Sequence, residues 1–302
     1  MANVLILLTL PEPIRNQYRD RLRNRFPGIT IELVDHHSKV GPYIGKADAL
    51  ITFAPMLSSE VLAAATRLKW VQALGTGVDN LIDQPALRQD VIVTNMRAIH
   101  GAPVSEAALA GMLALARGAS PGYSCASRTA MAPLSSAAST SQDGRFGVGQ
   151  IAEILALKCK AFGMRVVGVT SAPRKLAGLD RMHRREELAR VIGDFDFLIL
   201  LTPLTTATRN SIDAEIFAAM KPTSYLINLA RGGVVDEAAL IEALAKERIA
   251  GAALDVFNQE PLPADHPFWS MSNVIITAHQ AGSAMSTSIM PCPRSRRTWS
   301  AF

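Results

Sequence analysis

The sequence has no hydrophobic run long enough to cross a membrane. Its first apolar segment, Val4 to Leu8, is short and is followed by Pro11 and then by charged residues. A membrane-spanning helix needs about 20 consecutive apolar residues, and a secretory signal peptide carries a longer apolar region behind a basic start. We therefore expect a cytoplasmic protein with no membrane partner.

Cysteine is also scarce, with only Cys125, Cys159 and Cys292 in the chain. No two of these residues are closely spaced, and no Cys and His residues show the short separations of a zinc site. Disulfide bonds and a bound metal ion are therefore not expected.

Concentrated positive charge is lacking, although the net charge of the chain is +5. Apart from Arg184-Arg185 and the stretch from Arg294 to Arg297, the basic residues are scattered along the sequence. A nucleic-acid-binding protein would gather such residues on one face, so an ordinary solvated surface explains the charge better than a nucleic-acid partner. A protein that binds anionic nucleotides and carboxylates also has reason to be basic.

What the sequence does contain is a regular alternation of short apolar runs with amphipathic stretches. This pattern is typical of an α/β fold with a doubly wound parallel sheet, and 302 residues suffice for two such domains. The apolar runs expected to be strands are Val4 to Leu8, Ile29 to Val34, Ala49 to Phe53, Trp70 to Leu74, Val91 to Thr94, Val166 to Val169, Phe197 to Leu201, Tyr225 to Leu229, Ala250 to Val256 and Val274 to Thr277.

A long apolar helix is expected between the two groups of strands. Pro103 to Glu106 is followed by the apolar run Ala107 to Ala116, and Ser105 is a candidate N-cap for this helix. The small residues of the run suit close packing against another helix.

Residues Ala119 to Arg145 interrupt the pattern, with seven serines and neither Ile nor Val. Taken alone, such a segment is most often a flexible linker. A strand should however stand directly before the glycine motif that follows, and Ser141 to Arg145 occupies that place. We therefore expect the central strand of the second sheet to be missing or truncated.

The glycine motif, which runs from Gly147 to Ala152, fits the pattern GxGxxG/A and opens the helix-compatible run Ile151 to Phe162. Its glycines allow a tight turn and the approach of a pyrophosphate to the N-terminus of the helix. A strand from Arg165 to Val169 follows at the interval expected for the ribose end of a dinucleotide. The motif therefore predicts a binding site for NAD(P).

The ribose position lacks a carboxylate. The strand ends in Thr170 and Ser171, and Arg174 and Lys175 follow closely. An Asp or Glu at the strand end would bond the ribose 2′-hydroxyl and repel a 2′-phosphate, so its absence favours NADP over NAD. The alternative is that Arg174 and Lys175 are ordinary loop charges.

Three polar residues follow buried strands in the last third of the chain: Arg231, Glu260 and His279. The carboxyl ends of parallel strands are where open α/β sheets bind ligands. His279 can supply a proton, Glu260 can orient it and keep it protonated, and Arg231 can bind a carboxylate and polarise a carbonyl. Each residue alone is more often structural, but their order together suits the reduction of a 2-keto acid. Asp255 would face the nicotinamide.

The remaining histidines lack such a setting, and we interpret them as surface or structural residues. They are His36, His37, His100, His183 and His266.

Three segments carry a specific family resemblance: Asn228 to Leu240, Gly251 to Pro263 and Trp269 to His279. They resemble the D-isomer-specific 2-hydroxyacid dehydrogenases, which include glyoxylate/hydroxypyruvate reductases and phosphoglycerate dehydrogenases. The resemblance extends over roughly residues 1–118 and 146–281. It implies an NAD(P)-dependent enzyme that interconverts a small 2-keto acid and a D-2-hydroxy acid.

The resemblance also implies roles for individual residues. Arg231, Glu260 and His279 are the expected catalytic set, and Arg231 together with the backbone of Gly77 and Val78 is expected to bind the substrate carboxylate. The expected cofactor-binding residues are Gly147, Val148, Gly149, Gln150, Ile151, Ser171, Arg174, Thr202, Pro203, Ala230 and Asp255.

In this family two Rossmann/flavodoxin-like domains flank a cleft. We accordingly expect a substrate-binding domain at residues 1–100 and an NAD(P)-binding domain at residues 101–281, irregular at 119–145. A helix after His279 usually returns to the first domain, but residues 282–302 are an irregular tail. A family-like homodimer is doubtful because of the two disrupted segments.

A shifted reading frame explains the tail. The genetic code permits a set of codons for the tail that also has a second meaning. When this set is read from the third base of its first codon, it encodes Cys-Asp-Val-Tyr-Ile-Asp-His-Ala and then a string that resembles the family's closing helix. We infer a frame change near residue 280, and residues 119–145 are open to the same explanation. The competing interpretation of the whole chain is therefore an impaired or non-enzymatic relative, either a degenerate product or a nucleotide-binding module.

Overall fold

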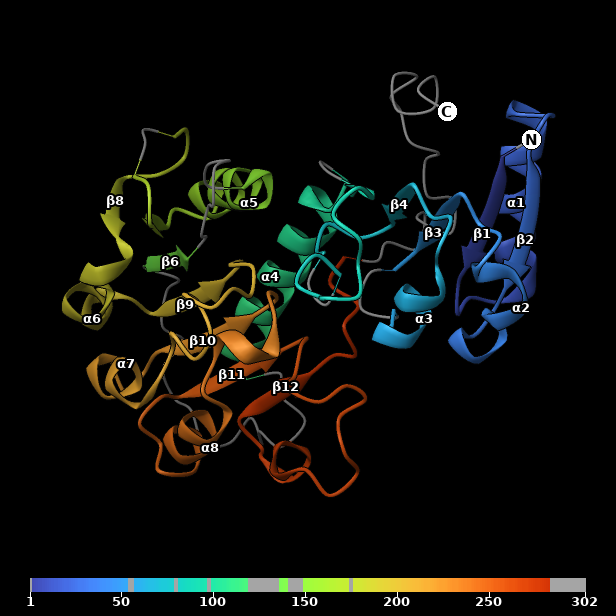
Figure 1. Ribbon diagram of the computed structural model, residues 1–302. Coiled ribbons are helices and arrows are strands. Elements are labelled where there is room, and N and C mark those ends of the chain that lie inside the picture. Colours follow the sequence, from blue (N-terminus) through green and yellow to red (C-terminus); the bar gives the residue numbers. More distant parts are fainter. Residues whose placement is uncertain are drawn as a thin grey trace. The chain divides into compact units, whose positions relative to one another are not determined.

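The computed structural model describes residues 2–53, 57–78, 81–96, 99–118, 149–173 and 176–282, together with the backbone of Ser136–Thr140. The chain divides into two compact units, one formed by residues up to Ile99 and the other beginning at His100. Each unit contains one parallel sheet with helices on both faces, which confirms the expected fold class (Figure 1). Of the expected tail at 282–302, only Gly282 is described, and residues 283–302 lie outside the described residues.

The first unit has a five-stranded sheet in the order β2-β1-β3-β4-β5. Each strand begins and ends within one residue of an apolar run predicted from the sequence. The strands are β1 (Asn3–Leu7), β2 (Thr30–Val34), β3 (Ala49–Thr52), β4 (Trp70–Ala73) and β5 (Ile92–Thr94), and the helices are α1 (Glu12–Arg25), α2 (Gly41–Ile44) and α3 (Ser59–Ala64).

Alternation along β1 shows why this sheet is covered on both sides. Val4 and Ile6 pack in one core with Leu22 of α1, whereas Leu5 and Leu7 pack in another core with residues of α2 and α3. Successive side chains of a strand point to opposite faces, so a strand that is apolar at every position needs helices on both.

The second unit has a seven-stranded parallel sheet in the order β12-β11-β10-β9-β6-β7-β8. The strands are β6 (Ser136–Thr140), β7 (Arg165–Thr170), β8 (Arg181–Arg184), β9 (Phe197–Leu200), β10 (Tyr225–Asn228), β11 (Gly251–Leu254) and β12 (Val274–Ile276). The helices are α4 (Gly101–Ala116), α5 (Gln150–Ala161), α6 (Leu188–Val191), α7 (Ala214–Ala219) and α8 (Glu237–Ala245).

Helices α4 and α5 cover one face of this sheet, and α6, α7 and α8 cover the other (Figure 1). Met112 of α4 and Leu155 of α5 share a core with Ile227 of β10, whereas Phe217 of α7 and Leu244 of α8 belong to the opposite core. The loops at the carboxyl ends of β10, β11 and β12 extend from this rigid framework.

The expectation that the central strand is missing or truncated is wrong. The backbone of Ser136–Thr140 forms β6, which pairs with β9 on one side and β7 on the other. Backbone N–H and C=O groups make these pairs, so flanking strands can hold a segment whose side chains give no strand signal. The remaining residues of the serine-rich segment, 119–135 and 141–148, lie outside the described part of the chain.

Two further differences from the sequence-based expectation concern β8 and Ser105. Strand β8 was not predicted because Arg181–Arg184 has no apolar run, which an edge strand does not require. Helix α4 begins at Gly101, so Ser105 is not its N-cap. The hydroxyl of Ser105 is fully buried and donates to the carbonyl of Ala102, and Pro103 is tolerated in the first turn.

Within the described ranges, none of the helices is both long and apolar enough to cross a membrane.

Candidate active site

Arg231 lies in the loop that follows the carboxyl end of β10, and Asn228 fixes this loop. The side chain of Asn228 is buried; its amide donates to the carbonyl of Arg231 (3.2 Å), and its oxygen accepts from the N–H of Ala230 (3.1 Å). The guanidinium of Arg231 donates to the carbonyl of Ala230 (2.7 Å). Sequence reasoning identified Arg231 and Ala230 but missed Asn228, which closes the turn between them.

Gly232 brings this loop against the loop that follows β11. A Cβ atom at position 232 would collide with the carbonyl group of Phe257 and with the N–H of Asn258. Only glycine permits the two backbones to approach so closely. The contact places the segment that carries Arg231 beside the segment that carries Glu260.

Glu260 and His279 form a direct pair. Nδ1 of His279 lies 2.8 Å from one carboxylate oxygen of Glu260, and the other oxygen accepts from the N–H of Phe257 (3.0 Å). The side chain of His279 is 45% exposed and that of Glu260 is 37% exposed, so the pair can be reached from solvent. Because the carboxylate occupies Nδ1, the Nε2 side of the imidazole is left to face a ligand.

Glu260 is held in its ionised form. Partial burial acts to raise the pKa of Glu260, but the hydrogen bonds from His279 and Phe257, together with the charges of His279 and Arg231, lower it below the ordinary value. An ionised Glu260 accepts at Nδ1 of His279 and thereby fixes the orientation of the imidazole.

Asp255 anchors the loop that carries His279. Its carboxylate is 1% exposed and accepts from the hydroxyl of Thr277 and from the N–H groups of Gln280 (2.8 Å) and Ala281 (2.9 Å). The N–H of His279 donates to the carbonyl of Asp255 (2.8 Å). From the sequence, Asp255 is expected to face the nicotinamide. In the structure its carboxylate accepts hydrogen bonds from Thr277, Gln280 and Ala281.

His279 has a left-handed backbone, with φ of 50°. Non-glycine residues rarely adopt this conformation, which persists where the surroundings fix it and is most frequent at functional sites. The hydrogen bonds to Asp255 supply that constraint. The structure thus brings Arg231, Glu260 and His279 together at the carboxyl ends of the neighbouring strands β10, β11 and β12.

Gly77 and Val78 lie in the first unit, in the loop after β4. Thr76 donates from its hydroxyl to the carbonyl of Met96 (3.1 Å), and the amide of Asn95 donates to the carbonyl of Thr76 (2.6 Å). These bonds fix the loop against the segment that follows β5.

The glycine motif leads into α5, as the sequence predicted. Gly149 is the N-cap residue of this helix, and a Cβ atom at this position would meet no atom within 4 Å. Gln150 and Ile151 form the first turn. An exposed helix N-terminus of this kind suits an anionic phosphate group. Gly147, Val148 and Arg174 lie outside the described residues.

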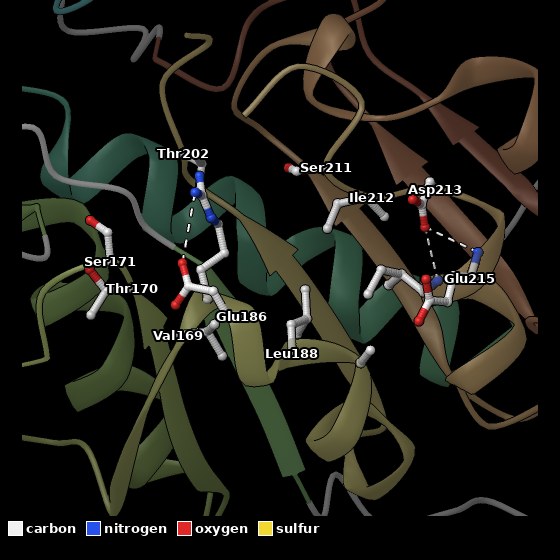
Figure 2. A pocket seen from close by; sticks show the side chains of 13 residues that line it. Val169, Thr170, Ser171, Glu186, Leu188, Thr202, Ser211, Ile212, Asp213 and Glu215 are labelled. Atoms are coloured by element: carbon white, nitrogen blue, oxygen red, sulfur yellow. Dashed lines mark hydrogen bonds and ion pairs between the residues drawn. The ribbon is translucent and has the colours of Figure 1, made fainter. Parts of the chain in front are cut away.

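A pocket of about 240 Å³ opens beside the carboxyl ends of β7 and β9 (Figure 2). Ser171 and Thr202, both predicted cofactor-binding residues, line it, whereas Pro203 follows directly in the chain. Arg185 and Glu186 also line the pocket and were missed, because the strand before them has no apolar signal. Arg185 donates to the carbonyl of Ala207 (2.8 Å), which connects the two loops at the pocket.

The described residues contain no group of three His, Cys, Asp or Glu side chains that could hold a metal ion. Cys159 is buried, and burial raises the pKa of its thiol to about 11, so it is not a reactive thiolate.

Two family models match the chain. The catalytic domain of D-isomer specific 2-hydroxyacid dehydrogenase matches residues 6–171, and the NAD binding domain of the same enzymes matches residues 109–281.

Characterised relatives carry three different names. An (S)-sulfolactate dehydrogenase of Chromohalobacter salexigens is 37% identical over 228 residues, which cover 74% of each chain. A glyoxylate reductase of Korarchaeum cryptofilum is 32% identical, over 80% of this chain and 75% of that protein. A D-3-phosphoglycerate dehydrogenase of Methanocaldococcus jannaschii is 33% identical over 80% of this chain and 47% of that protein, so the chain spans about half the length of this relative.

A solved structure extends the similarity to the fold. The NADPH-dependent glyoxylate/hydroxypyruvate reductase of Sinorhizobium meliloti, in complex with NADP and sulfate, aligns with a TM-score of 0.78 at 25% identity. The alignment covers 93% of this chain and 89% of that one.

Proposed function

Because the chain belongs to the D-isomer specific 2-hydroxyacid dehydrogenase family, we propose that it interconverts a small 2-keto acid and the corresponding D-2-hydroxy acid with NAD(P) as cofactor. One observation carries the proposal: the 2.8 Å contact between His279 and Glu260, with Arg231 on the adjacent loop. These three groups match the proton and charge requirements of the reaction.

In the direction of reduction, the proposal assigns a role to each of the three groups. Nε2 of His279 donates a proton to the carbonyl oxygen of the substrate, and Glu260 stabilises the charged imidazole through Nδ1. Arg231 binds the substrate carboxylate and polarises the carbonyl. For Gly77 and Val78, whose loop belongs to the first unit, the proposed role is carboxylate binding through backbone N–H groups. When bound, the reduced nicotinamide supplies the hydride that completes the new C–H bond.

The second unit suits the cofactor. The N-terminus of α5 at Gly149 would hold the pyrophosphate, and the pocket lined by Ser171 and Thr202 would hold the adenosine end. Ala230 and Asp255 stand at the ends of β10 and β11, on the side of the sheet where the nicotinamide would lie.

NADP is the preferred form of the cofactor in this proposal. Thr170 and Ser171 end β7 without a carboxylate, and Arg174 follows in the sequence. Replacing Arg174 by Ala should weaken the binding of NADPH much more than that of NADH, because only NADPH has a 2′-phosphate for the guanidinium to bind. Fluorescence titration with both cofactors measures this difference. Equal effects on the two would exclude Arg174 from phosphate binding.

The substrate is best sought among small 2-keto acids. Relatives named glyoxylate reductase, sulfolactate dehydrogenase and phosphoglycerate dehydrogenase suggest a panel of glyoxylate, hydroxypyruvate and the keto acids with a second anionic group at C3. The proposal is tested by following NADPH and NADH oxidation with each substrate, with an Arg231→Ala variant as the control for specific turnover.

The competing interpretation, a nucleotide-binding module without activity, predicts a different result in the same assay. It requires binding of NADPH with no turnover of any substrate in the panel. A version of the chain with the reading frame corrected over residues 119–145 and 280–302 separates an impaired product from a true binding module. Turnover that appears only in the corrected version would identify the present chain as a degenerate enzyme.

A further inference from the structure

His100 stands at the point where the chain enters the second unit. It is the N-cap of α4, and its side chain is turned to the segment at the other end of this unit. Nδ1 of His100 lies 3.3 Å from the carbonyl oxygen of Gly282. A Cβ atom at position 282 would lie only 3.1 Å from the same nitrogen, so the imidazole packs directly on the glycine.

Gly282 lies three residues after His279 in the segment that follows β12. Asp255 holds the first part of this loop through Thr277, Gln280 and Ala281, as described above. His100, the N-cap residue of α4, adds a contact at Gly282. The left-handed backbone of His279 therefore lies within a loop that side chains fix both before and after it.

The chemistry of the contact defines the tautomer of His100. A carbonyl oxygen only accepts, so Nδ1 of His100 must carry the hydrogen and donate it. Burial, together with the positive charge of Arg231, lowers the pKa of His100, and the hydrogen bond to Gly282 offsets this only in part. His100 is therefore neutral at pH 7, and its imidazole has a fixed orientation beside the cation of the site.

We propose that His100 is a positioning residue for His279, which it serves by holding the Gly282 carbonyl at the end of the loop formed by residues 277–282. No sequence motif predicts this role, because His100 and Gly282 are far apart in the chain. The effect on turnover rests on the proposed function, whereas the effect on the position of His279 does not.

The first test compares His100→Ala with His100→Asn in the full chain. The Ala variant loses the donor, and we expect kcat to fall by up to about 100-fold, the loss that a displacement of about 1 Å can cause. The KM for the cofactor should stay unchanged. The amide of Asn can replace Nδ1 as donor, so we expect most of the loss to be restored. His37→Ala, at an exposed imidazole of the first unit, is the control and should match the parent.

The second test needs no activity. Long-range ¹H–¹⁵N spectra of histidine-labelled protein should show the Nδ1–H tautomer for neutral His100, and the ring signals of His279 should shift in His100→Ala and return in His100→Asn. An Nε2–H tautomer, or His279 signals that do not respond to the loss of His100, would overturn the proposal. Coupling of the two rings in an inactive protein would support this inference while refuting the proposed function.

Discussion

At the scale of single residues, the proposed reaction depends on Nε2 of His279 as the proton donor. Replacing His279 by Ala should lower turnover by about 10² to 10⁴, the usual range for a positioned general acid. Binding of NADPH should persist, because no contact proposed for the cofactor involves this side chain. Steady-state kinetics and fluorescence titration measure the two effects, and unchanged turnover would remove His279 from the mechanism.

Glu260 gives the site a defined response to acid. Its pKa is below the ordinary value of 4.5, so the carboxylate stays ionised at neutral pH and its interaction with His279 is lost only as the pH falls through the lowered pKa. We expect kcat/KM for reduction to show no fall from this group until the pH is below 4.5. Glu260→Gln should lower kcat/KM at neutral pH and abolish that acid limb. A limb that persists in Glu260→Gln would assign it to another group.

Sequence reasoning could identify the residues whose motifs carry chemistry, but not those that act through distant contacts. Arg231, Glu260 and His279 were predicted because each follows a buried strand in a recognisable order. His100 was interpreted as surface or structural because it lacks such a setting, and its contact with Gly282 joins residues far apart in the chain. Such a contact depends on the fold as a whole, and no local sequence pattern predicts it.

At the scale of elements, the close approach of two loops at Gly232 is essential to the site. The Gly232→Ala change places a methyl group against the backbone of Phe257, which neither loop can avoid without moving. We expect a loss of about 1 to 3 kcal/mol in the free energy of unfolding and a larger proportional loss of activity. Urea unfolding and kinetics measure both. Gly28→Ala, where a Cβ would meet no atom within 4 Å, is the matched control and should leave both unchanged.

Strands with apolar runs could be predicted from the sequence, and strands without them could not. Each of the ten predicted apolar runs contains a strand, and most of the strand ends lie within about one residue of the predicted end. The prediction succeeds because a strand that is buried on both faces must be apolar throughout. Strand β8 is polar because it lies at an edge. Strand β6 is held between β7 and β9 by backbone pairing, and its serine and alanine residues resemble those of a linker.

At the scale of the whole molecule, each unit has its own sheet and its own cores. Because each unit buries cores of its own, each can unfold as a cooperative unit, and we expect two transitions in a calorimetric scan. All the contacts proposed for NAD(P) belong to the second unit. Saturation with NADPH at about 100 times its Kd should therefore stabilise that unit by about 2.7 kcal/mol and raise one transition only. A uniform shift of both transitions would show that the cofactor is held by both units.

The three side chains proposed to be catalytic follow β10, β11 and β12, which are consecutive strands in the chain and adjacent in the sheet. The segment from Tyr225 to Gly282 therefore contains all three proposed groups, while β9 and α4 complete the scaffold around it. Strand β6 of the serine-rich segment pairs with β7 and β9 and with none of these three strands. The proposed proton-transfer groups can therefore be inherited together as one contiguous stretch of sequence, while the strands β6 and β7 beside the proposed nucleotide site change.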